Sequence, residues 1–259
     1  LFAIGALILY NGLVQENNKK LFIAGVVLGL NVMVRFPNLT EAALIVTLWY
    51  ACFLKRESLK SAMHKTVCCI SGYLLGFTVP FVWVIFRYGL SSFTDMLSSL
   101  SAIKEVDESY SSLSMITSVL SAYTRSFKWV LFIVVGIVLG MMMFCVLRGK
   151  LVMLKKTLFL FGIAIMLRFF WGRGMFSFRY YEDYTSMFEW GMLALYLSII
   201  ASVFVLACKN FDYRIKVMAV IVLVILIITP LGSNNYTCQN LNNLFLVMPF
   251  TIYVVSYWF

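Results

Sequence analysis

The stretch "GVVLGLNVMVRFPNLTEAALIVTLWY", from Gly25 to Tyr50, is apolar almost throughout but carries Arg35, Pro37 and Glu41 in its middle. The apolar residues on both sides suit helices. Proline has no amide hydrogen to donate and disfavours helical backbone in the residue before it, so the chain is expected to turn near Pro37. We therefore predict two short helices joined as a hairpin.

The composition around this stretch is typical of an integral membrane protein. Hydrophobic residues make up 62% of the chain, charged residues 12%, and the mean hydropathy is +0.92. A soluble domain has roughly 45–50% apolar residues. The class predicted is an all-α, polytopic helical membrane protein with about eight or nine transmembrane helices.

The apolar runs give the expected spans. They lie near 1–14, 21–34, 39–54, 66–87, 129–147, 157–170, 187–207 and 214–231, and a ninth starts near 243. The chain starts with Leu1 rather than Met, and both of its ends cut into apolar runs. We expect residues 1–259 to be a single transmembrane domain that is a fragment of a longer protein.

Charge assigns the loops to the two sides of the membrane. The loops 15–20, 55–65, 148–156 and 208–216 hold thirteen Lys and Arg and three Asp and Glu, whereas the remaining chain holds eight of each. Basic loops stay in the cytoplasm, so these four loops are predicted to be cytoplasmic. Contact with an anionic inner leaflet explains the basic excess, and no nucleic acid is required.

The same assignment supports the hairpin. Loops 15–20 and 55–65 share one side only if residues 21–54 cross the membrane twice, which puts Arg35 and Glu41 at the outer surface and lets Asn38 or Thr40 cap the returning helix. Each arm of fourteen residues rises only about 21 Å, less than the ~30 Å hydrocarbon core. The alternative is that the turn lies below the outer surface of the membrane, in a recess lined by protein.

Three further segments lie on the predicted outer side. The loop at about 88–128 is Ser-rich and has apolar residues at helical spacing, which predicts amphipathic helices on the membrane plane. A second loop crowds arginines among aromatic residues, and a third is rich in Asn. Arginine suits phosphate, and Asn both donates and accepts hydrogen bonds, so these segments favour a lipid-linked sugar phosphate. The predicted binding residues are Arg35, Asn38, Glu41, Arg173, Arg179, Asn234 and Asn235.

Structural explanations of the same residues stay open. Arg35 suits an interfacial anchor, the arginine and aromatic cluster suits a membrane belt, and the Asn residues suit turns and caps. Glu182 and Asp183 suit ion pairing with nearby arginines. The cysteines have no C-x-x-C spacing and His64 is the single histidine, so no cofactor or metal site is indicated.

The segment "IAGVVLGLNVMVRFPNLTEAALI" resembles one found in polytopic glycosyltransferases of the GT-C type. Gly25, Gly29, Leu30 and Arg35 carry the resemblance. It implies an enzyme, a hexosyltransferase, that moves a sugar from a polyprenyl-phosphate donor on the outer face of a membrane. The membrane expected is the bacterial plasma membrane. It also implies a catalytic acid in an earlier outer loop, upstream of this sequence, and such enzymes can use a divalent metal.

Two other classes remain as alternatives. A surface-polysaccharide polymerase or ligase would also place arginines in large outer loops, but it would lack the early acidic residue. A transporter would place polar residues near the midplane of several spans, whereas these spans are nearly free of charge outside the 35–41 turn.

Overall fold

The computed structural model describes residues 1–34, 36–106, 152–172, 187–228 and 243–257, with residues 113, 116–121, 123–124, 127, 131, 134–136, 140 and 231 between them. Every regular element in these ranges is helical, which confirms the all-α prediction. The elements are α1 (Phe2–Val14), α2 (Asn18–Val34), the 3₁₀ helix η1 (Phe36–Leu44), α3 (Ile45–Leu54), α4 (Leu59–Tyr88), α5 (Leu90–Val106), α7 (Val152–Gly172), α8 (Met187–Ala207), α9 (Tyr213–Ile227) and α11 (Leu244–Ser256).

Helix α4 differs most from its predicted range. It starts at Leu59, so most of the predicted loop 55–65 is helical. The reason is a cap: the Ser58 side chain accepts a hydrogen bond from the Ser61 amide. Within the described residues, α4, with its 30 residues, is the one helix long and apolar enough to cross a membrane. The count of eight or nine spans stays a prediction.

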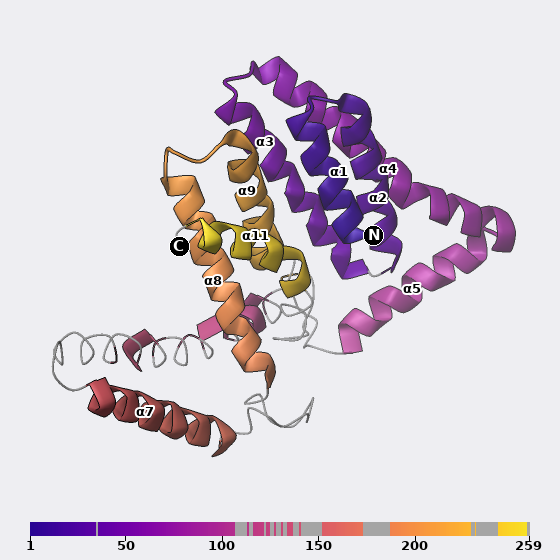
Figure 1. Ribbon diagram of the computed structural model, residues 1–259. Helices are drawn as coiled ribbons and strands as arrows, with labels where there is room; N and C mark the ends of the chain where they lie inside the picture. Colours follow the sequence, from indigo (N-terminus) through magenta and orange to yellow (C-terminus); the bar gives the residue numbers. More distant parts are fainter. Residues whose placement is uncertain are drawn as a thin grey trace.

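The predicted hairpin is confirmed. Helix α2 is followed by η1 and α3, and the α3–α4 loop returns to the α1–α2 loop, where Lys55 Nζ lies 2.5 Å from Glu16 Oε1. Figure 1 shows α1, α2, α3 and α4 grouped together. The predicted cap by Asn38 or Thr40 is wrong, because α3 begins after Leu44 and that residue offers no side-chain hydrogen bond.

Glycines set the packing of α2 against α4. A Cβ atom added at Gly25 would lie 2.1 Å from the carbonyl oxygen of Cys69, and one at Gly29 would lie 2.1 Å from that of Tyr73. Gly72 and Gly76 on α4 are equally close to α2. Small residues four apart on both helices let the backbones touch, as in helix pairs within membranes.

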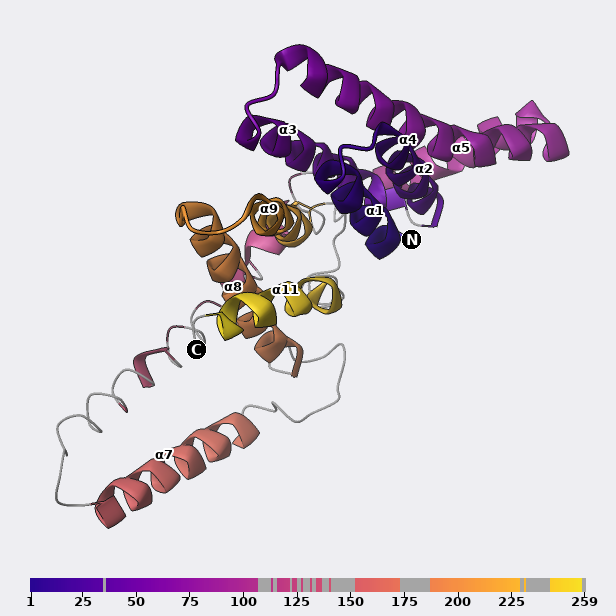
Figure 2. The ribbon, with the colours of Figure 1, turned by 45° about the horizontal axis from the view of Figure 1, so that its top comes forward.

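A second group of helices is built around α9. Buried side chains cover most of α9, and α8 and α11 pack beside it (Figure 2). The buried hydroxyl of Thr251 on α11 donates a 2.6 Å hydrogen bond to Ser198 on α8. This group extends the core of the helical bundle, since α9 also contacts α1 and α3.

The segment predicted as amphipathic helices at 88–128 is only partly exposed. Helix α5 occupies its first part, and the apolar residues Leu113, Ile116 and Leu120 are exposed. Val119 is buried, however, and the Tyr123 hydroxyl donates a 2.9 Å hydrogen bond to the Leu226 carbonyl of α9. Among the described residues of the later part, Tyr123 therefore contacts the bundle, and the position of this segment on a membrane plane stays a prediction.

Candidate functional site

A polar cluster closes the tip of the α2–α3 hairpin. Asn31, near the end of α2, donates a hydrogen bond of 2.7 Å from Nδ2 to Glu41 Oε1 in η1. Asn38 donates from its own Nδ2 to the Asn31 carbonyl oxygen at 3.0 Å. Three polar side chains thus tie the 3₁₀ helix back onto α2.

The prediction that the Glu41 carboxylate lies at the outer surface is wrong, because the side chain is buried within the protein. Only 4% of Glu41 is exposed, and 6% of Asn31. Glu41 precedes the buried Leu44 and Leu48 by three and seven residues, so it shares their inward face. Its Oε2 atom is buried and has no hydrogen-bond partner among the described residues.

An unpaired buried carboxylate oxygen is costly, because desolvation of the group is not repaid by a hydrogen bond. A donor that is not among the described residues would satisfy this atom, and a ligand is one source of such a donor. The recess inferred from the short hairpin arms is thus consistent with the burial of Glu41. Asn31 was missed in the sequence; it lies three residues after the buried Leu28, a helical spacing that places both side chains on one face of α2.

The structure brings together two of the predicted binding residues, Asn38 and Glu41. The other five lie outside the described residues: Arg35, Arg173, Arg179, Asn234 and Asn235. Glu182 and Asp183 lie outside them as well.

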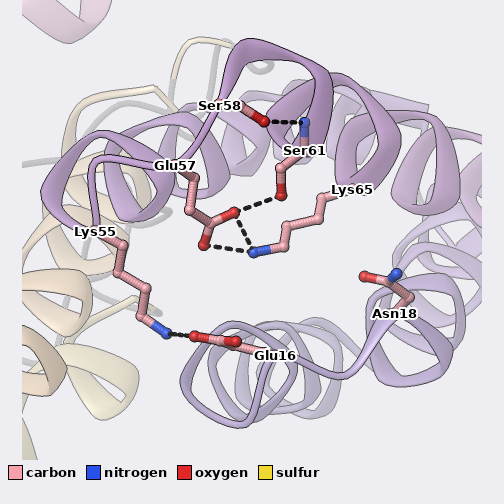
Figure 3. Close-up of a pocket in the computed structure, with 7 residues that line it drawn as sticks. All are labelled: Glu16, Asn18, Lys55, Glu57, Ser58, Ser61 and Lys65. Atoms are coloured by element: carbon pink, nitrogen blue, oxygen red, sulfur yellow. Dashed lines mark hydrogen bonds and ion pairs between the residues drawn. The ribbon is translucent and has the colours of Figure 1, made fainter.

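A second polar site lies at the opposite end of the hairpin, where the two basic loops meet (Figure 3). This charged pocket has a volume of about 470 Å³. The α1–α2 region contributes Glu16 and Asn18, the α3–α4 loop contributes Lys55, Glu57 and Ser58, and α4 contributes Ser61 and Lys65.

The same turn builds both loops of the charged pocket. Glu16 and Arg56 each follow a helix with φ of 54°, and the next amides, of Asn17 and Glu57, donate back to Gly12 and Cys52. This hydrogen-bond pattern is a Schellman turn, which reverses the chain directly after a helix. Two equal turns therefore present Glu16 and Glu57 at one end of the bundle.

Ion pairs hold the walls of the charged pocket. Lys65 Nζ lies 2.6 Å from both oxygens of Glu57, and the Ser61 hydroxyl donates to Glu57 Oε2 at 2.7 Å. Burial alone would raise the pKa of Glu57, but the hydrogen bonds from Lys65 and Ser61 hold it below its usual value. The hydrogen bond and charge of Lys55 lower the pKa of Glu16. Both carboxylates are therefore ionised at neutral pH.

The described residues contain no group of three or more His, Cys, Asp and Glu arranged to hold a metal ion. No protein family, curated protein or solved structure was found to match the chain.

Proposed function

We propose that the chain is part of a membrane glycosyltransferase that moves a sugar from a polyprenyl-phosphate donor, with eight or nine spans around an outer site. The observation that carries this proposal is the buried cluster of Asn31, Asn38 and Glu41 at the break between α2 and α3. Its unpaired carboxylate oxygen suits a sugar hydroxyl, which would donate to it.

Arg35 supplies the other half of the chemistry. It directly precedes η1 in the sequence, six residues before Glu41. A guanidinium keeps its charge and offers paired donors to the lipid phosphate that leaves as the sugar is transferred. Glu41 is a binding group in this proposal. The base that accepts the acceptor's proton is expected upstream, as the resemblance implies.

The experiment measures sugar transfer by the full-length protein in detergent, using a panel of radiolabelled polyprenyl-phosphate hexoses. We expect Arg35→Ala to lower the rate by about 100-fold or more, the usual effect of removing one electrostatic donor. Arg87→Ala is the matched control, because Arg87 is exposed in the last turn of α4. It should transfer at the wild-type rate.

Wild-type-like transfer by Arg35→Ala would remove the role assigned to this arginine. Transfer only from a diphosphate-linked oligosaccharide would point to the polymerase or ligase instead. Failure of every lipid-linked donor, with both variants normally folded, would overturn the proposed reaction.

A transporter is the second candidate, because a buried acid beside a break between two helices is also the arrangement of ion-coupled carriers. The two candidates differ in what they need. Transfer proceeds in detergent, whereas transport requires sealed vesicles, so uptake by proteoliposomes without transfer in detergent would favour the transporter.

A further inference from the structure

The charged pocket is large enough to hold a small polar headgroup. Its volume of about 470 Å³ is within the range of roughly 300–1,000 Å³ that is usual for small-molecule pockets. Two carboxylates, of Glu16 and Glu57, and two ammonium groups, of Lys55 and Lys65, line it (Figure 3). A wall with both signs of charge is complementary to a ligand that also has both.

The pocket holds hydrogen-bonding groups that the described residues do not use fully. Lys65 is only 9% exposed and directs two N–H groups at Glu57, whereas an ammonium has three. The Oδ1 atom of Asn18 is buried and has no hydrogen-bond partner within the described part of the chain. Figure 3 shows the Asn18 side chain beside the same space as Lys65. A ligand with one acceptor and one donor would satisfy both.

The start of α4 favours a phosphate as the ligand's acceptor. Helix α4 begins at Leu59, directly after the pocket residue Ser58. Its N-terminal end carries partial positive charge, which stabilises an anion. Lys65 stands on the second turn of α4 and adds a full charge.

We propose that the charged pocket binds a headgroup that joins a phosphate to a primary amine, as phosphoethanolamine does. The phosphate lies beside Lys65 and the start of α4, and the ammonium donates to Asn18 Oδ1 and the carboxylates. This site is independent of sugar transfer. Since the pocket opens at one end of the long apolar α4, phosphatidylethanolamine is the source that its position favours.

The test uses the full-length protein purified in phospholipid-free detergent. Short-chain phosphatidylethanolamine, phosphatidylcholine and phosphatidylglycerol are titrated separately, and binding is followed by native mass spectrometry and by the thermal unfolding midpoint. We expect the ethanolamine lipid to bind at least about tenfold more tightly than the other two. The choline group has no N–H to donate, and the glycerol group has no positive charge.

Variants locate the site. Lys65→Met should remove binding of the ethanolamine lipid, because its phosphate loses the ammonium beside it, while Lys60→Met, at an exposed position of the same helix that does not line the pocket, should keep that binding. Asn18→Ala leaves both ion pairs intact and should lower the affinity for the ethanolamine lipid by about tenfold. It therefore tests the site even if Lys65→Met fails to fold.

A soluble competitor identifies the source of the headgroup. If free phosphoethanolamine displaces the lipid at a similar concentration, the ligand is a soluble ester. If it displaces the lipid only at far higher concentration, the ligand is the membrane lipid. Equal binding of all three lipids, or an unchanged preference in Asn18→Ala, would overturn the proposal.

Discussion

The pair of Asn31 and Glu41 makes the first prediction, at the scale of single residues. Asn31 donates the single hydrogen bond that Glu41 accepts from the described residues, and both side chains are buried. Asn31→Leu would leave the carboxylate with no partner at either oxygen among the described residues. We expect this change to lower the free energy of unfolding in detergent by about 1–3 kcal/mol, the cost of stranding a buried polar group.

The double variant Asn31→Leu with Glu41→Leu separates two costs: that of a buried carboxylate without a hydrogen-bond partner, and that of lost packing. Replacing both polar partners by apolar groups removes the unpaired atoms, so the double variant should be more stable than the sum of the single effects predicts, by about 0.5–3 kcal/mol. Denaturant titrations of the four proteins measure the coupling. Strictly additive costs would show that the hydrogen bond has no part in stability.

The burial of Glu41 did not follow from the charge of the loops, which placed the hairpin turn at the outer surface. Its helical spacing did carry a signal, because Glu41 shares the face of Leu44 and Leu48. Its partner Asn31 lies on another helix. Periodicity reports which face of one helix is buried, whereas the pairing of two faces depends on how the hairpin closes.

At the scale of helices, the α2–α4 contact gives the next prediction. The carbonyl oxygen of Tyr73 lies 2.1 Å from where a Cβ atom of residue 29 would stand, so an alanine there must push the helices apart. We expect Gly29→Ala to destabilise the protein by at least about 2 kcal/mol, since overpacking forces a shift of backbone. The thermal unfolding midpoint in detergent would fall accordingly.

Gly162→Ala in α7 is the matched control, because nothing lies within 4 Å of a Cβ atom added there. In an open helical position alanine is preferred over glycine by up to about 1 kcal/mol, so this variant should be neutral or slightly stabilising. Equal behaviour of the two variants would show that α2 and α4 are not in backbone contact.

Helix ranges were largely predictable, whereas helix partners were not. The apolar runs predicted α1, α8 and α9 to within a few residues. Gly25 and Gly29 carried the resemblance to glycosyltransferases, but the structure gives them a packing role against Cys69 and Tyr73. No local sequence pattern in α2 predicts that it packs against α4, because contacts between distant segments depend on how all the helices pack together.

At the scale of the whole molecule, charge was the most informative part of the sequence. The rule that basic loops share one side required residues 21–54 to form a hairpin, and the ion pair of Lys55 with Glu16 confirms that the two loops meet. The charged pocket was missed because its lysines look like ordinary solvated loop residues. Only the folded chain shows that Lys65 is buried against Glu57.

The arrangement of the loops leads to a prediction for the intact membrane. If α4 crosses the bilayer, positions before and after it must face opposite sides, whereas the two loops joined by Lys55 and Glu16 must face the same side. Single cysteines are introduced by Lys19→Cys, Lys60→Cys or Ser91→Cys, after replacing the six native cysteines with alanine. A membrane-impermeant maleimide should label only the Ser91→Cys protein in intact cells, and all three after permeabilisation.

Labelling of Lys19→Cys and Ser91→Cys from the same side would exclude α4 as a span. Labelling of Lys19→Cys and Lys60→Cys from opposite sides would contradict the hairpin, because their two loops form one pocket.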